Sequence, residues 1–338
     1  MFQFMRSSPH LTIFLSLLVW TFCITQRTEA GIVTFGSGAN SFTMEFVDIG
    51  DKANAADTVT GYGGVAYTFR AGKTEVSNAM IAVYNALQDP DISTLSTVAD
   101  RPAQGITFRQ AAAFVNWMNE ETGNVAAYNV DSGTGAIVQW NAIDHPDDYD
   151  ASNPWRSTRS VYVLPTLDEF YKAAYYNSSA SQYFAYPTGS DTAPTAVSSG
   201  TSANTAVFDD NPSDFDFLGN PAAIDQAGGL SAYGVMGLGG NVAELSETGY
   251  DDFGDYVRFE LGGSYTSPVQ LLAAASQGSG AQELLDDESY SGTGFRVYEI
   301  ADFGDVVPEP SSLMVLVLFS AGTWFYRRRR GLCCMSPP

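Results

Sequence analysis

The chain has 338 residues and is acidic, with 38 Asp and Glu against 16 Lys and Arg and a formal net charge of −22. Such a chain repels nucleic acid and anionic lipid, so we expect no nucleic-acid partner. It holds three cysteines and two histidines, at Cys23, Cys333, Cys334, His10 and His145.

Residues 1–30 have the pattern of an export signal. Arg6 precedes an apolar stretch from Leu11 to Ile24, and small residues stand just before Gly31. A positive start, an apolar middle and a small-residue end are typical of a signal peptide. We expect cleavage after Ala30, so that the exported chain begins at Gly31.

The first half of the exported chain predicts two strands and two helices. Apolar and polar residues alternate over residues 41–46 and 65–69, which is typical of strands with one buried face. Ser77 and Thr107 each precede a segment with apolar residues at helical spacing, so both are expected to cap helices. The first helix is expected to end at Asp89-Pro90 and the second at Gly123-Asn124.

The second half is expected to hold little regular structure. Residues 124–160 are irregular, with an acidic loop over residues 144–150, and residues 161–163 predict a strand. Thr166 is expected to cap a short helix that carries Phe170. Gly, Asn and Asp dominate as far as residue 260, which predicts loops, and residues 294–298 predict a final strand.

The C-terminal region carries a second targeting pattern. Pro308, Glu309 and Pro310 stand before an apolar run, residues 313–326, which ends at the cluster Arg327, Arg328, Arg329 and Arg330. The run is shorter than the roughly 20 residues of a stable spanning helix, so we expect a short transmembrane helix that anchors the protein only transiently. This order resembles the PEP-CTERM sorting signal of exported bacterial proteins. The resemblance implies that a sorting protease and the export machinery process residues 306–330, and that residues 331–338 form a tail. The alternative is an ordinary membrane anchor that is never cut.

Removal of both ends would leave a chain without cysteine, because Cys23, Cys333 and Cys334 all lie in the processed segments. A thiol nucleophile, a disulfide and a thiolate metal site are then excluded. The single remaining His145 cannot build a histidine cluster. Acids and bases must come from carboxylates, Tyr or Lys, and any metal must be a hard ion that prefers oxygen.

Five segments, in order, resemble the formylglycine-generating enzyme, or sulfatase-modifying factor, family. Their counterparts in the family read KYEVTN, LPTEAEWEYAA, YGLYDMHGNVWEW, RGGSW and GFRV. In this chain they are residues 72–78, 163–174, 233–244, 262–265 and 294–297. The resemblance covers about residues 42–300, and we assign residues 31–305 to one domain. It implies an α+β fold of the C-type-lectin-like kind, rich in loops, with bound calcium.

The chain departs from the family where the chemistry takes place. Family enzymes oxidise a substrate cysteine with two cysteines that bind copper shortly after the GGSW segment. Here that stretch offers hydroxyl and aliphatic groups from Thr266, Ser267, Leu271 and Leu272. Without thiolates there is no soft site for Cu(I), and the histidine cluster of related iron enzymes is also missing. We therefore expect neither copper nor iron.

The resemblance also implies calcium ligands. For one site the family uses carbonyls and a glutamate that match Gly240, Val242 and Glu244, although an upstream ligand falls on Gly237, which has no side chain. For a second site it uses an Asn, the next carbonyl and a later Asp, which match Asn204, Thr205 and either Asp214 or Asp216. Calcium takes six to eight oxygen ligands, which acidic loops can supply. The alternative is that Asn204 and Glu244 serve only to bond the backbone.

Three further candidates favour structural roles. Asp168 and Glu169 are adjacent, so they do not face each other and suit the first turn of a helix. His145 stands in a loop and is expected to be solvated. An aromatic group, which could stack on a sugar, is more typical of a packed core; it comprises Tyr175, Tyr176, Tyr183, Phe184 and Tyr186.

The sequence thus predicts an exported, non-catalytic domain of this fold that acts as a binding or structural component of the cell surface or extracellular matrix. Proteins with this sorting signal tend to accompany exopolysaccharide production, which makes an extracellular polysaccharide the expected partner class; fold alone does not establish it. The alternative is an oxidoreductase-type enzyme of the family with altered chemistry. A polar cleft with converging side chains beside residues 263–272 would favour the enzyme, and a filled apolar patch would not.

Overall fold

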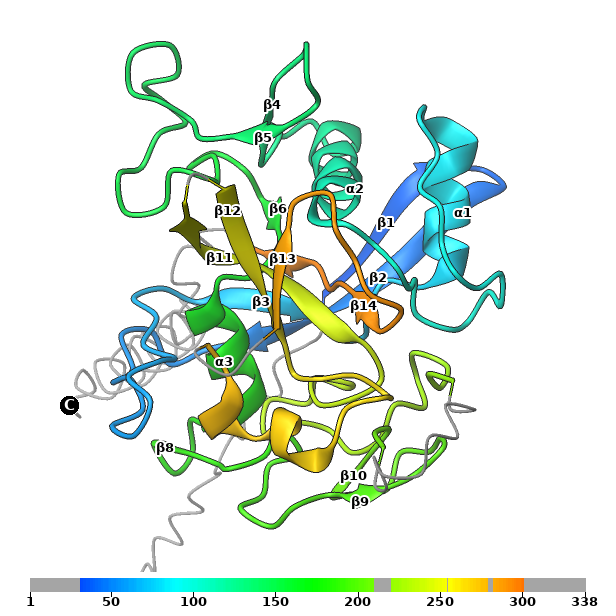
Figure 1. Ribbon diagram of the computed structural model, residues 1–338, viewed down its shortest axis with the longest axis vertical. Coiled ribbons are helices and arrows are strands. Elements are labelled where there is room, and N and C mark those ends of the chain that lie inside the picture. Colours follow the sequence, from blue (N-terminus) through cyan, green and yellow to red (C-terminus); the bar gives the residue numbers. More distant parts are fainter. Residues whose placement is uncertain (1–30, 210–219, 254, 279–281, 301–338) are drawn as a thin grey trace, which may run out of the picture.

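The computed structural model describes residues 31–209, 220–253, 255–278 and 282–300, and the statements below concern these residues. They form two sheets, three short ribbons and three α-helices, joined by long loops (Figure 1). The helices are α1 (Asn78–Leu87), α2 (Phe108–Glu121) and α3 (Leu167–Tyr175), with the 3₁₀ turns η1 (Val269–Leu272) and η2 (Ala274–Ser276).

The larger sheet joins the two ends of the described domain. Its order is β1 (Gly31–Ser37), β2 (Asn40–Ile49), β3 (Phe69–Gly72), β15 (Tyr298–Glu299) and β6 (Tyr162–Val163), and all neighbours are antiparallel. The last strand of the described residues, β15, therefore lies between an early and a middle strand. Such long-range pairing brings sequence motifs from both halves of the chain to one place.

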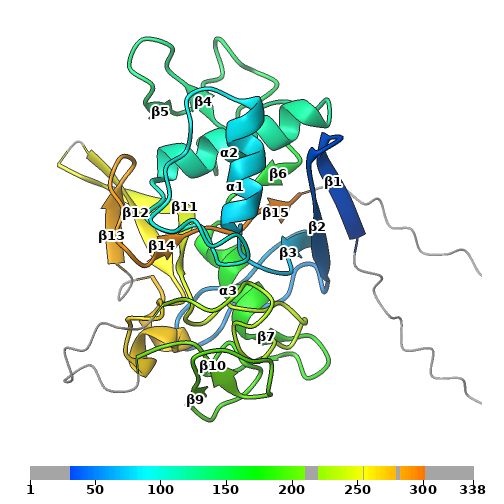
Figure 2. The same cartoon turned by 90° about the vertical axis from the view of Figure 1, so that its right-hand side faces the viewer.

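The second sheet is built around a long hairpin. Its order is β13 (Gln282–Leu285), β12 (Asp255–Leu261), β11 (Ala243–Asp252) and β14 (Thr293–Gly294). Three ribbons pair β4 (Asn129–Val130) with β5 (Ile137–Val138), β7 (Tyr176–Asn177) with β8 (Gln182–Tyr183), and β9 (Thr195–Ala196) with β10 (Thr205–Ala206). Helices α1 and α2 lie at one end of the molecule and the β9–β10 ribbon at the other (Figure 2).

The three predicted helix starts are confirmed. Ser77 accepts a hydrogen bond from the backbone N–H of Met80 at the start of α1. Thr107 and Thr166 each form a reciprocal cap with the residue three positions later, Gln110 and Glu169. These side chains bond backbone N–H groups that have no partner within the helix, which is why such residues mark helix starts.

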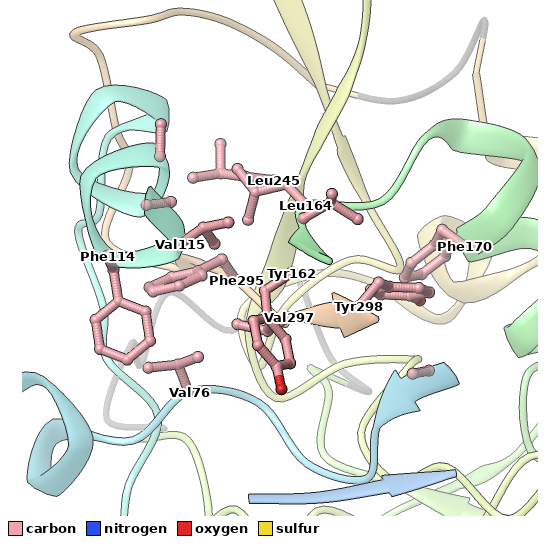
Figure 3. Close-up of a cluster of buried hydrophobic side chains, with 14 of the residues drawn as sticks. Val76, Phe114, Val115, Tyr162, Leu164, Phe170, Leu245, Phe295, Val297 and Tyr298 are labelled. Carbon is pink, nitrogen blue, oxygen red and sulfur yellow. The ribbon is translucent and has the colours of Figure 1, made fainter. Parts of the chain in front are cut away.

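The core lies where the two sheets meet α2 and α3 (Figure 3). Phe114 and Val115 on α2, Phe170 on α3 and Leu245 on β11 are all buried. The closing segment passes between them: Phe295 packs edge-on against Phe114, with ring centroids 5.5 Å apart. The GFRV segment is therefore a central part of the core, and its position determines where the neighbouring loops lie.

Three predictions about strands need correction. The strand predicted over residues 65–69 begins only at Phe69, because Val65 bonds instead to the loop at Ala53 and Asn54. Residues 243–261, predicted as loop, form the β11–β12 hairpin; the glycines and aspartates of residues 249–255 outweighed the alternation of residues 257–261. The final predicted strand is divided between β14 and β15, which belong to different sheets.

Candidate functional site

A tight turn follows β12 and opens the candidate site. Gly262 and Gly263 have φ angles of 83° and 71°, in the left-handed region that glycine tolerates best. A Cβ on Gly262 would also lie 2.6 Å from the carbonyl oxygen of Leu238. The backbone N–H of Gly262 donates to Oε1 of Gln277 at 2.9 Å, which ties the turn to the loop after η2. Glycine is thus required by both conformation and space.

Beside this turn lies a cleft of about 260 Å³, here called the Ser264 cleft. Its walls carry six hydroxyl groups, from Ser264, Thr266, Ser267, Ser276, Tyr290 and Ser291. Leu271 supplies an apolar wall, and Tyr290 is half exposed. The segment that corresponds to the family's oxidation site therefore borders a polar cleft and is not a filled apolar patch.

The inner hydroxyls bond to one another. Ser264 Oγ lies 3.0 Å from Thr266 Oγ1 and 3.3 Å from Ser267 Oγ, and the backbone N–H of Ser264 donates to Ser267 Oγ at 2.9 Å. Thr266, Ser267 and Leu271 line the cleft as the sequence suggested, while Leu272 is fully buried. The described walls thus present hydroxyl and aliphatic groups where the family's chemistry uses thiolates.

Glu260 on β12 also lines the cleft, although it was not among the candidates predicted from the sequence. Its side chain is only 5% exposed, and its Oε1 has no hydrogen-bond partner among the described residues. Burial raises the pKa of this carboxyl to about 7, opposed by a hydrogen bond with the Thr293 side chain. A signal was present, because Glu260 and Arg258 alternate with Val257, Phe259 and Leu261.

The predicted calcium ligand Glu244 is bound to an arginine. Its carboxylate accepts from Arg296 Nη2 at 2.6 Å and from Nε at 2.9 and 3.1 Å, and both side chains are buried. Burial raises the pKa of Glu244, and the Arg296 charge opposes that rise. A guanidinium at this distance takes the place that a cation would need, so the Glu244 side chain does not fit a calcium site.

A second buried glutamate, Glu75, stands beside this pair and joins the first and third family motifs. Glu75 accepts from the side-chain amide of Asn241 at 2.6 Å and from the backbone N–H of Val242 at 3.1 Å. Burial raises its pKa to about 8, with Arg296 opposing and Glu244 adding to the rise. The segment from Gly240 to Glu244 is therefore held by Glu75 and Arg296, and we assign it a structural role.

The second predicted calcium site is only partly described. Asn204 has a φ of 53°, and its Oδ1 accepts from Thr188 Oγ1 at 2.8 Å. The carbonyls of Asn204 and Thr205 accept from the backbone N–H groups of Thr195 and Gly229. Asp214 and Asp216 lie outside the described residues. Within the described residues, no group of three or more His, Cys, Asp or Glu side chains is placed to hold a metal. Calcium at the Asn204 loop stays a prediction.

The other candidates have structural surroundings. Glu169 caps α3 and accepts two 2.8 Å bonds from the buried Arg156, while Asp168 accepts from the backbone N–H of Gly63. His145 packs edge-on against Trp140. Of the aromatic group, Tyr175 and Tyr176 are buried, and Tyr183 packs on Tyr176 with ring centroids 4.9 Å apart.

The targeting predictions fall outside the described residues. These are the cleavage position Ala30, the motif Pro308, Glu309 and Pro310, and the cluster Arg327, Arg328, Arg329 and Arg330. The apolar run at residues 313–326 lies there too. In the part of the chain that the structure describes, no helix has the length and apolar character needed to span a membrane.

Comparison with known families identifies the domain. Residues 38–300 match the family of the sulfatase-modifying factor enzyme 1-like domain, FGE-sulfatase. The chain belongs to this family. The match extends from before β2 to the end of β15 and contains all five motifs. The sulfatase-modifying factor membership predicted from those motifs is therefore confirmed, while the sorting signal stays a prediction.

Solved structures show the same fold as this sulfatase-modifying factor domain. Treponema denticola variable protein 1 aligns with a TM-score of 0.50 and 19% identity, over 79% of this chain and 98% of that protein. CarF aligns with a TM-score of 0.56 and 17% identity, over 77% of this chain and 99% of CarF. The predicted loop-rich α+β fold is confirmed. A sequence comparison with curated proteins found no match.

Proposed function

We propose that this chain is an exported, non-catalytic member of the sulfatase-modifying factor family that binds a ligand in the Ser264 cleft. It acts as a binding or structural component of the cell surface or extracellular matrix, with an extracellular polysaccharide as the partner class. The observation that carries the proposal is the cleft itself: it is open and polar, yet hydroxyls and Leu271 stand where the family's oxidation uses thiolates.

Cysteine oxidation by this family requires a soft metal held by thiolates, and Cu(I) prefers sulfur ligands. Ser267 and Thr266 offer hard hydroxyl oxygens that already bond to Ser264. Cys23, Cys333 and Cys334 all stand outside the residues that match the family. Binding in the cleft survives this change, because hydroxyl walls still recognise polar ligands.

A peptide assay tests the absence of oxidation. The purified chain is incubated with a sulfatase-type cysteine peptide, with and without copper, next to a cysteine-containing family enzyme as positive control. We expect the peptide mass to stay unchanged. Conversion of the thiol to the aldehyde above the no-protein background would overturn the non-catalytic proposal and require another cofactor in the cleft.

Two observations favour an enzyme as the second candidate, and the first is the polar cleft beside residues 263–272. Glu260 is a buried carboxyl in the cleft with a pKa of about 7, which suits a general acid or base near neutral pH. Against this, the described walls pair no hydroxyl with a basic side chain, and Ser264, Thr266 and Ser267 bond to one another. Turnover of any substrate that is abolished in Glu260→Gln would establish this candidate.

Calcium remains part of the proposal at the Asn204 loop alone. Asn204 and Thr205 place one side-chain oxygen and two carbonyls on adjacent residues; each accepts one hydrogen bond from a neutral donor and keeps a second lone pair for a cation. Oxygen-rich loops of this kind suit calcium. The Glu244 segment is left out, because Arg296 already neutralises that carboxylate.

A further inference from the structure

Glu260 is a buried carboxylate without a counter-charge. Arg258 lies two residues earlier on β12. Its Nε is 2.8 Å from Oδ1 of Asp286, and its Cζ is 3.9 Å from the centroid of the Phe108 ring. No charged group of the described residues compensates Glu260 in the same way: burial raises its pKa, and the hydrogen bond with Thr293 is what opposes the rise. Opposite it in the sheet stand Leu245 on β11 and Gln282 on β13.

Such an arrangement is costly in the free protein. A buried ionised carboxylate without a partner costs several kcal/mol, and an unmet hydrogen-bond acceptor adds to that cost. The Oε1 atom of Glu260 has neither a partner nor solvent contact among the described residues. Glu260 nevertheless lines the cleft, so a ligand that brings a positive charge and hydrogen-bond donors to its carboxyl group would reduce both costs.

The surroundings of Glu260 define the rest of the ligand. The cleft of about 260 Å³ is smaller than the roughly 300–1,000 Å³ of pockets for drug-sized molecules, so the ligand is small. Its hydroxyl walls match a ligand with several hydroxyl groups. Gln277 is not available, since its amide already bonds Gly262, Leu271 and Ala273.

We propose that the Ser264 cleft binds a small polyhydroxylated amine, whose ammonium group is held by Glu260 and whose hydroxyl groups are held by the serine and threonine walls. The proposal rests on the proposed binding function and specifies its ligand class. Ammonium and carboxylate form a charge-assisted hydrogen bond, which is about twice as strong as a neutral one. An anionic ligand would be repelled, and one carboxylate among neutral hydroxyls is a poor match for calcium, which takes six to eight oxygens.

Glucamine and sorbitol test this ligand class, because they share a polyol skeleton and differ by an amine in place of a hydroxyl. Titration calorimetry at pH 8 with the full chain should give glucamine a Kd about tenfold or more below that of sorbitol, the value of one charged hydrogen bond. Glu260→Gln should weaken glucamine binding by a similar factor and leave sorbitol nearly unchanged. Glu120→Gln, on the exposed side of α2, removes the same charge elsewhere and should change neither.

Lowering the pH provides a second test of the role of Glu260. The amine of glucamine stays protonated, as that of lysine does, while Glu260 gains a proton as the pH falls through about 7. Between pH 8 and pH 6 the affinity of the wild-type protein for glucamine should fall about tenfold, with no such change in Glu260→Gln.

Each outcome bears on a different claim. Equal affinity for glucamine and sorbitol, no binding of glucamine at all, or an unchanged Kd in Glu260→Gln would each overturn the ammonium site. None of these would restore cysteine oxidation, which the peptide assay measures by itself. Conversely, formylglycine production would overturn the non-catalytic proposal while the glucamine measurement would still report on Glu260.

Discussion

Glu244 and Arg296 form a fully buried ion pair in which both carboxylate oxygens accept from the guanidinium, the shortest contact being 2.6 Å. Arg296 also donates to the carbonyls of Gly72 and Met236 at 2.9 and 2.7 Å. One side chain thus connects the first, third and last family motifs. The pair explains why the Glu of the GNVWEW-like segment is structural here.

Glu244→Ala should therefore destabilise the protein strongly, with or without calcium. Removing one partner of a buried ion pair leaves the other charge unpaired, which costs about 3–5 kcal/mol in the free energy of unfolding. Lys73→Ala is the matched control, because its pair with Glu45 is more than a third exposed. Its effect should stay at about 0–1 kcal/mol. Urea unfolding measures both, and similar effects in the two variants would contradict the structural role of Glu244.

Glu260→Gln should change the pH dependence of stability. The folded pKa of about 7 lies above the usual value of 4.5, so the unprotonated carboxyl is penalised by folding. The wild type should lose stability as the pH rises from about 4.5 to 7, by up to about 3 kcal/mol from this group. The variant, which cannot ionise, should be the more stable of the two at pH 8. Denaturant unfolding at pH 4.5 and pH 8 checks this, and a constant difference between the proteins would rule it out.

Calcium should raise the Tm of protein first stripped with chelator, because a ligand bound only by the folded state stabilises it. Asn204→Gly should reduce that rise. Glycine keeps the positive φ of 53° without strain and removes only the side-chain oxygen. Differential scanning calorimetry gives both values. Absence of any shift in the wild type would remove the metal, and an unchanged shift in the variant would move the site elsewhere.

Processing should shorten the exported protein at both ends. We expect the material released by the native host to begin near Gly31 and to end near the Pro308–Pro310 motif, without the Arg327–Arg330 cluster. Intact-mass measurement of secreted protein reads both ends at once. Recovery of the arginine cluster on the mature surface protein would instead support a permanent anchor.

Short stretches of sequence determined where the helices begin and which family the chain resembles. Ser77, Thr107 and Thr166 mark the three helix starts because a side-chain oxygen bonds an N–H within three residues, so no distant contact is needed. The five motifs likewise indicated the family, since each contains residue types suited to a particular turn or core position. The expectation of no thiolate chemistry came from the positions of three cysteines alone.

The partners of the buried charges were decided only by the tertiary structure. Glu244 resembles a calcium ligand in sequence, but Arg296, 52 residues later, lies against it because β14 pairs with β11. Glu260 stood in a segment predicted as loop. Its lack of a charged partner depends on how β12, the Gly262 turn and the 290–293 loop enclose the cleft. Whether a carboxylate meets a cation, a metal or an open cleft depends on distances between residues far apart in the chain, and only folding sets those distances.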